Sequence, residues 1–298
     1  MGLNTKILAI AIQKGGVGKT AIAVNLSYLL AEDSYPVAGR PTARKPLKVT
    51  LIDLDPQCNS SHTLLMHNKQ EEVEFPVGQT SAAFFGWSMD SDDSLSWDMD
   101  LPFPAAIPVS PVFGQFYDGK IKCIPGHSLA LADADALDPE LVFDVAQRIR
   151  DYALQSDDDV IIIDCSPQLG VRQIVAMLAA DHIVTPINSD AYSEKGLDKF
   201  VATFLQVQES NEDCKLHIIP NKVDSKSNDN LVNLDLLREK IGEWMTDSNI
   251  PYSNSISKAL DVGRPPWRKA PSGNDALIGR QVRAALTELL ARCEIVAE

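Results

Sequence analysis

Short apolar runs rich in Ile, Val and Leu recur along the chain, and segments with helical periodicity separate them. The runs are continuous rather than alternating with polar residues, which is typical of parallel strands buried on both faces. We predict strands at residues 6–13, 48–55, 160–166, 182–188 and 215–223. We predict helices at residues 19–31, 130–155, 171–180, 194–209, 231–245 and 275–292. This alternation predicts an α/β fold with a doubly wound, mostly parallel sheet flanked by helices.

The alternation of strands and helices is interrupted at residues 67–120, where Pro, Ser, Asp and Gly separate short apolar stretches. We interpret this segment as an irregular insertion or lobe. The chain shows no internal repeat and no linker that would divide it. We therefore predict one domain over residues 1–298, with the insertion inside it.

Composition places the chain among globular proteins. Of its 298 residues, 45% are hydrophobic and 23% are charged, which excludes a disordered or collagen-like chain. The longest apolar runs are well short of the roughly 18 to 20 residues that span a bilayer, and the N-terminal residues lack the pattern of a secretory signal. The five cysteines are scattered and never spaced C-x-x-C, which disfavours a disulfide framework or a zinc knuckle. We expect a cytoplasmic protein with reduced thiols.

The net charge of −14 argues at first against a nucleic-acid partner, because phosphates repel an acidic body. The acidic residues, however, are concentrated between residues 87 and 160, which contain 15 acidic and 4 basic residues. Residues 37–48 and 258–283 are locally basic. A basic patch can bind an anionic partner that the total charge would repel.

A glycine-rich segment, Lys14-Gly-Gly-Val-Gly-Lys19-Thr20, follows the first predicted strand and opens the first predicted helix. This is the context that a phosphate-binding loop requires. The glycines let backbone N–H groups surround phosphate oxygens, Lys19 neutralises the β- and γ-phosphates, and the Thr20 hydroxyl can hold Mg²⁺. Gln13 stands where a standard Walker A motif has glycine. The plain alternative is a glycine-rich turn that binds nothing.

The segment resembles instead the deviant Walker A motif, KGG-x-GK-[ST], of the ParA/MinD family, and most closely that of ParA/Soj-type partition ATPases. The resemblance implies a P-loop NTPase fold with ATP and Mg²⁺ as cofactors. It also implies a homodimer around ATP, in which Lys14 reaches the nucleotide of the partner; otherwise Lys14 is simply a solvated residue. The nucleotide-binding positions carried over in the loop are Gly15, Gly16, Val17, Gly18, Lys19, Thr20 and Ala21.

Three further elements extend the resemblance. In the D-x-D-P-Q element at residues 53–57, Asp55 would orient the attacking water and Asp53 would support the loop and the Mg²⁺ shell. The run at 160–167 resembles a Walker B strand, so Asp164 would reach Mg²⁺, through a water molecule. The segment at 218–223 resembles the strand that carries an asparagine to the adenine, which is Asn221 here. Each also has a structural alternative, since strand-end carboxylates cap turns and asparagine is common in turns.

The chain departs from the family pattern at three positions, where Ala21, Cys58 and Ser166 replace the residues that members often carry (Thr or Ser, Gly and Pro). None of these changes removes a phosphate or metal ligand, so they weaken only the subfamily assignment. Residues 35–46 also lengthen the connection between the phosphate loop and the second strand, and we expect a longer loop there.

The C-terminal segment 257–265 resembles the one that precedes the last helix of ParA proteins. A basic surface there would bind DNA without sequence preference, by phosphate neutralisation; the alternative is an ordinary solvated helix face, with Trp267 in the core. Its residues would be Arg264, Arg268, Lys269, Arg280 and Arg283. The implied function is a slow, partner-stimulated ATPase on the nucleoid. A ParB-like or cargo adaptor would be its partner in plasmid or chromosome partition or in cargo positioning.

Three other functions compete with this one. A MinD-like ATPase would lay its last helix on a membrane, and an apolar stripe does run along the predicted last helix, at Ile278, Val282, Leu286, Leu289 and Leu290. We expect that stripe to pack on the sheet, so membrane binding is disfavoured. An iron–sulfur carrier related to nitrogenase iron protein would need paired cysteines. A metabolic ATP-dependent ligase on the same fold is disfavoured by Lys14 and the D-x-D-P-Q element.

Overall fold

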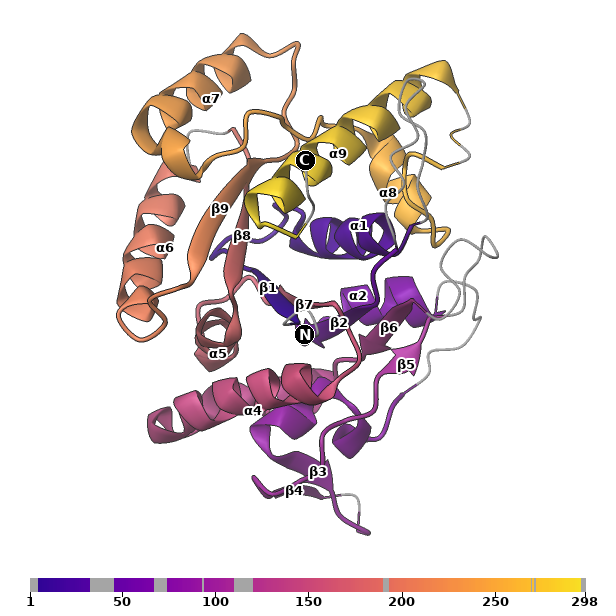
Figure 1. Cartoon of the computed structure of the whole chain (residues 1–298), viewed down its shortest axis with the longest axis vertical. Helices are drawn as coiled ribbons and strands as arrows, with labels where there is room; N and C mark the ends of the chain where they lie inside the picture. The colour runs from indigo at the N-terminus through magenta and orange to yellow at the C-terminus, as the bar shows by residue number, and fades with distance from the viewer. Residues whose placement is uncertain are drawn as a thin grey trace.

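A seven-stranded sheet forms the centre of the molecule, with the strand order β5-β6-β2-β7-β1-β8-β9 (Figure 1). The computed structural model describes residues 5–32, 46–66, 74–92, 94–109, 120–189, 193–268, 270 and 272–295. All neighbours from β6 to β9 are parallel, and β5 pairs with β6 antiparallel at the edge. The strands are β1 (Lys6–Ile10), β2 (Val49–Leu54), β5 (Ile107–Pro108), β6 (Ile121–Ile124), β7 (Val160–Cys165), β8 (His182–Ile187) and β9 (Lys215–Pro220).

Helices cover both faces of this sheet (Figure 1). One layer contains α1 (Lys19–Ala31) and α9 (Gly273–Arg292). The other contains α4 (Val142–Gln155), α5 (Val171–Ala179), α6 (Ser193–Gln208) and α7 (Asn228–Ile241). The remaining α-helices of the described chain are α2 (Asn59–Ser61), α3 (Ser128–Asp133) and α8 (Asn254–Leu260). The doubly wound α/β fold is confirmed.

The continuous apolar pattern of the strands follows from these two layers. In β1, Ile7 and Ala9 pack against the layer of α4 to α7, whereas Leu8 and Ile10 pack against the layer of α1 and α9. Both faces of each central strand must therefore be apolar, so no polar alternation is possible. All five predicted strands are present.

Three of the differences between the secondary structure and the prediction have a clear physical reason. The predicted helix at 130–155 is wrong as one element, because a break that contains Pro139 separates α3 from α4. Proline at the start of a helical turn sets the backbone for a new start rather than for continuation. The short elements β6 and α8 were missed, since four and seven residues respectively carry too little periodicity.

The described part of segment 67–120 contains short 3-10 turns, β5 and a two-stranded hairpin of β3 (Trp87–Met89) and β4 (Leu95–Trp97). Phe84 is fully buried and meets Tyr152 of α4 edge to face, with ring centroids 5.6 Å apart. Arg148 of α4 donates hydrogen bonds to the carbonyl oxygens of Phe84 and Leu101. This part of the segment is thus packed firmly on α4. That the segment is an insertion stays a prediction.

Candidate functional site

The carboxyl ends of β1, β2 and β7 meet at one edge of the sheet, where the chain leaves β1 for α1 and crosses β7 to reach β2. Such a switch in strand order creates the usual binding crevice of an open α/β sheet. The strand register places Asp53 of β2 beside Asp164 of β7, and Asp164 beside Ile10 of β1. The phosphate loop begins just beyond β1, so the sequence signals of three separate segments converge here.

The loop itself owes its path to two glycines in the left-handed region, Gly16 at φ 72° and Gly18 at φ 91°, which other residues adopt only with strain. Val17 between them is fully buried and anchors the loop. Lys19 Nζ donates a hydrogen bond to the carbonyl oxygen of Lys14, 3.1 Å away. Gly18 caps α1 without any side-chain hydrogen bond, and the first turn of α1 carries no acidic residue. The N-terminus of α1 is therefore suited to an anion.

The residues after β9 hold this loop from the side. Asn221 Nδ2 donates a hydrogen bond of 2.6 Å to the carbonyl oxygen of Val17. Lys222, itself left-handed at φ 54°, donates from Nζ to the carbonyl oxygen of Gly16, also at 2.6 Å. Sequence reasoning singled out Asn221 for the adenine but missed Lys222. The adenine contact stays a prediction.

Asp164 is a fully buried carboxyl group near the carboxyl end of β7. Neither of its oxygens has a hydrogen-bond partner among the residues that the structure describes, and its side chain is fully buried. Burial, with the nearby charge of Asp53, raises the pKa of Asp164 to about 8, and Thr20 and Lys19 act in the opposite direction. Burial also lowers the pKa of Lys19, against the charges of Asp164 and Asp55. A bound cation would relieve this unpaired carboxylate.

Asp53 has a different environment, although it is equally buried. One oxygen accepts from the backbone N–H and the hydroxyl of Ser61, at 2.9 and 2.6 Å, and the other from the N–H of Asp55 at 3.1 Å. Burial raises the pKa of Asp53, and the hydrogen bonds oppose this. Asp53 thus anchors the end of α2 at Ser61, which fits a supporting role better than direct metal ligation.

Asp55 lies at the mouth of the site with 7% of its surface exposed. Its Oδ1 accepts a hydrogen bond of 3.0 Å from the N–H of Gln57, so the turn-capping contact predicted as the plain alternative is present. Cys58 follows at φ 51°, a conformation that favours glycine, and family members often have glycine here. The backbone at Cys58 thus has a conformation that glycine would adopt without strain.

Arg172, at the start of α5, is a buried residue that sequence reasoning missed, because no motif marks it. It forms an ion pair with Asp135 at 2.5 Å and donates to the carbonyl oxygen of Leu54 at 3.4 Å. That carbonyl directly precedes Asp55, so Arg172 braces the strand end that carries Asp55.

The predicted basic surface is only partly formed. Arg268 and Arg283 form ion pairs with Glu32, whose side chain is 1% exposed, and Trp267 donates to the same carboxylate. Trp267 itself is buried in the core beside α9. These two arginines therefore stabilise a buried acid at the end of α1. Lys269 lies outside the described residues.

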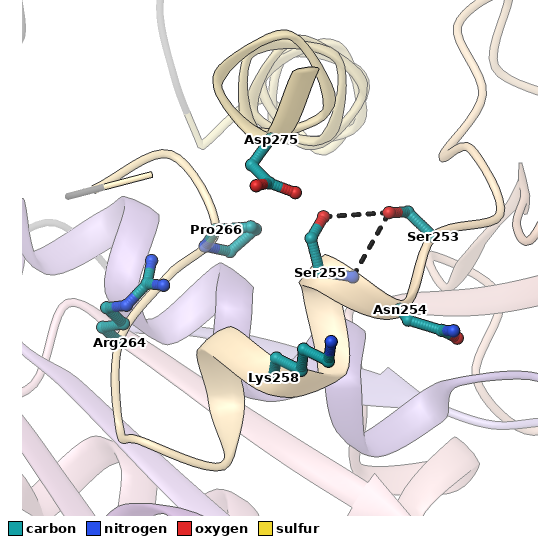
Figure 2. Close-up of a pocket in the computed structure, with 7 residues that line it drawn as sticks. All are labelled: Ser253, Asn254, Ser255, Lys258, Arg264, Pro266 and Asp275. Carbon is teal, nitrogen blue, oxygen red and sulfur yellow. Dashed lines mark hydrogen bonds between the residues drawn. The ribbon is translucent and has the colours of Figure 1, made fainter. Parts of the chain in front are cut away.

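The other two predicted cations are Arg280 and Arg264. Arg280 is exposed on α9. Arg264 donates to the carbonyl oxygen of Arg268 at 2.6 Å and lines a pocket of about 290 Å³ between α8 and α9, together with Lys258 and Asp275 (Figure 2).

The apolar stripe of α9 faces the core, as predicted. Its four fully buried residues pack with α1 and the sheet, and they are Val282, Leu286, Leu289 and Leu290. Ile278 is partly buried at the same surface. Among the described helices, none has both the length and the apolar character needed to cross a membrane.

Comparison with known proteins agrees with the geometry. Residues 8–267 match the CobQ/CobB/MinD/ParA nucleotide binding domain. Protein IncC of Escherichia coli is 30% identical over 298 residues, covering 97% of this chain and 70% of that protein. The sporulation initiation inhibitor protein Soj of Bacillus subtilis is 27% identical over 263 residues, covering 87% and 89%.

Two solved structures share the fold. The complex of a Cyanothece McdA variant with ATP has a TM-score of 0.72 at 21% identity, over 97% of both chains. Cobyrinic acid a,c-diamide synthase from Mycobacterium smegmatis, with ADP and magnesium bound, has a TM-score of 0.67 at 22% identity, over 97% of this chain and 96% of that one. The phosphate loop, the carboxylates beside it and these matches lead to one conclusion: the chain belongs to the CobQ/CobB/MinD/ParA family of nucleotide-binding domains.

Proposed function

We propose that this protein is a ParA-type ATPase that binds ATP with Mg²⁺ at the loop of residues 14–20. The observation that carries the proposal is the buried, unpartnered carboxylate of Asp164 beside that loop. Thr20 and Asp164 would hold Mg²⁺, the latter through water, while Asp53 would support them through α2. The ion, when bound, neutralises charge on the β- and γ-phosphates. ATP, or ADP with magnesium, is named in the two solved structures of this fold.

Lys19, Asp55 and Lys14 have separate roles in hydrolysis. Lys19, held over the loop by the Lys14 carbonyl oxygen, neutralises the transferred phosphoryl group. Asp55 orients the attacking water, and its hydrogen bond from Gln57 fixes the side chain. Lys14 reaches the nucleotide of a second copy, so hydrolysis requires an ATP-bound dimer. With one acidic residue to orient water, turnover is slow and a partner protein stimulates it.

We further propose that the ATP dimer binds DNA without sequence preference and thereby positions a plasmid, chromosome or other cargo on the nucleoid. The names of the relatives support this, since they include IncC, Soj and chromosome partitioning protein ParA. Arg264 and Arg280, with Lys269, are the residues of the basic segment that we assign to DNA. A ParB-like or cargo adaptor protein is the expected partner.

The burial of the apolar stripe of α9 disfavours the MinD-like alternative, because that face is not available to lipid. A ligase role draws support from the fold of cobyrinic acid a,c-diamide synthase, but Lys14 and the D-x-D-P-Q element argue against it.

One pull-down experiment separates these functions. The protein is incubated with bare DNA or with anionic liposomes, in the presence of ATP or ADP, and Lys19→Ala serves as the control that cannot bind nucleotide. ATP-dependent retention on DNA alone is the expected result. Retention on liposomes would favour the membrane function. Retention that is the same with ATP and with ADP, on DNA and on liposomes, would contradict ATP-dependent binding.

A further inference from the structure

A second cluster of chemically active side chains lies at the opposite end of the strands from the nucleotide site. It consists of His182, the first residue of β8, His217 in β9, and Cys293, which follows α9. All three are buried on the α9 face of the sheet, with exposed fractions of 3%, 6% and 0%. One ring nitrogen of each histidine and the sulfur of Cys293 lie within 4.8 Å of one another.

The two imidazoles are in direct contact. His182 Nδ1 and His217 Nε2 are 3.1 Å apart, and the rings are tilted by 42°. The other nitrogen of His182 is buried with no partner among the described residues. Two neutral rings in contact can share only one hydrogen, so a polar atom of His182 stays unsatisfied in whichever tautomer is present. A bound metal ion would satisfy such a buried, unpaired imidazole nitrogen.

We propose that His182, His217 and Cys293 bind a zinc ion. Tetrahedral zinc with bonds of about 2.0 to 2.3 Å to nitrogen and sulfur holds its ligand atoms roughly 3.3 to 3.6 Å apart. The ligand atoms lie within 4.8 Å of one another, so movements of about 1.5 Å or less would bring them to that geometry. Mixed imidazole and thiolate ligands select a borderline cation rather than Mg²⁺, whose ligands are oxygens.

The protonation states fit a metal site. Burial lowers the pKa of His182 to about 4 and, with the charge of His182, that of His217 to about 3, so both rings are neutral near pH 7. Burial raises the pKa of the Cys293 thiol to about 12, and zinc would displace its proton. Lys6, Lys215 and Arg292 act on the cluster as cations, and Asp181 and Glu294 as anions.

Glu294 is the acidic residue next to this cluster, although it is not one of its three members. It follows Cys293 directly at φ 57°, its carboxylate pairs with Lys215 at 2.7 Å, and its charge acts on both imidazoles. We assign the fourth position to Glu294 or to water. His217 also lines a pocket of about 380 Å³ with Lys215 and Arg292, which gives a path of entry from the surface. Bound zinc would fasten the last turn of α9 to β8 and β9.

The experiment uses the full chain without a polyhistidine tag, treated with chelator and kept reduced, in excess Mg²⁺ and without nucleotide. Zn²⁺ is titrated against a chromophoric competitor, and Co²⁺ is used as the spectroscopic probe. We expect one Zn²⁺ per chain, a higher midpoint of thermal unfolding with zinc, and a sulfur-to-cobalt charge-transfer band. Cys293→Ser and His217→Gln should each weaken zinc affinity by at least about 100-fold.

Cys214→Ser is the matched control, because Cys214 is also buried beside the start of β9 but belongs to the opposite layer. It should bind zinc as the unmodified chain does and keep the cobalt band. If Cys293→Ser fails to fold, His217→Gln still decides the question, since one ligand should suffice to lower affinity. No zinc binding by the unmodified chain, or binding that neither substitution changes, overturns the proposal.

Discussion

Asn221 Nδ2 donates a hydrogen bond of 2.6 Å to the carbonyl oxygen of Val17, and it thereby ties the end of β9 to the phosphate loop. The two residues are 204 positions apart in the chain. The amide also fills the space where a side chain at Gly18 would lie, since a Cβ there would be 2.3 Å from Asn221 Nδ2. Asn221 therefore shapes the loop in addition to the adenine contact that we predict for it.

This packing predicts that Gly18→Ala destabilises the protein even without nucleotide. The substitution forces alanine into the left-handed region at φ 91° and pushes Asn221 away, so we expect the free energy of unfolding to fall by about 2 kcal/mol or more. Gly15→Ala is the control, because a Cβ at Gly15 meets no atom within 4 Å. Thermal unfolding of both variants measures the difference. Equal losses would contradict the argument.

Substitution of Asp164 should increase the stability of the protein, whereas substitution of Gly18 should reduce it. Folding at neutral pH must either protonate the Asp164 carboxyl, whose pKa is raised to about 8, or bury its charge. Asp164→Asn removes that cost, so the nucleotide-free protein should gain about 1 kcal/mol or more of stability. The same change should abolish the extra stabilisation that Mg²⁺ gives with ATP. Asp53→Asn is the matched control and should lose stability, because Asp53 accepts hydrogen bonds from Ser61 and Asp55 that an amide nitrogen cannot accept. A stability loss in Asp164→Asn would contradict the assignment.

The meeting of the phosphate loop with Asp53 and Asp164 could be predicted because the signals are local and the sheet brings them together. β2 and β7 each carry an aspartate near their carboxyl ends, and parallel register then places Asp53 beside Asp164. The glycines of the loop follow β1 directly. Pattern, strand order and chemistry thus point to the same place.

The contacts that sequence reasoning missed join residues with no local signal. Glu32 and Arg268 are 236 positions apart, and nothing near either one indicates that they pair in the interior. His182, His217 and Cys293 belong to three separate parts of the chain, and no C-x-x-C or similar ligand spacing joins them. Nothing in the sequence therefore indicates that they lie together. The break between α3 and α4 was missed because apolar periodicity continues through it while Pro139 interrupts only the backbone.

The Glu32 cluster predicts that Arg268 is a structural residue. Arg268→Ala leaves the carboxylate of Glu32, which is almost fully buried, with the neutral donor Trp267 and with Arg283 at 3.7 Å. Breaking a buried ion pair costs about 3 kcal/mol or more, so the midpoint of chemical unfolding should fall clearly. Arg280→Ala, on the exposed face of α9, should stay within about 0.5 kcal/mol of the unmodified chain. Similar stability in both variants would contradict the structural role of Arg268.

DNA binding should accordingly be tested at Arg264 and Arg280 and not at Arg268, where charge reversal would place two acids together in the interior. We expect Arg264→Glu with Arg280→Glu to reduce ATP-dependent retention on DNA by at least about tenfold at fixed salt, because two phosphate contacts are lost per chain. ATP-dependent dimers should persist in light scattering. Unchanged retention with intact dimers would assign the DNA surface to other residues.

The dimer is tested by comparing Lys14→Ala with Asp55→Ala. Lys14 contacts Lys19 through its backbone carbonyl oxygen, which alanine retains, so Lys14→Ala should keep the loop and bind ATP normally. It should nevertheless fail to dimerise with a nonhydrolysable ATP analogue and Mg²⁺, since the charge delivered to the second nucleotide is gone. Asp55→Ala should dimerise but not turn over, because only the water-orienting carboxylate is lost. If Lys14→Ala still dimerises, the proposed role of Lys14 in the dimer is wrong. If Asp55→Ala hydrolyses ATP normally, the proposed water-orienting role of Asp55 is wrong.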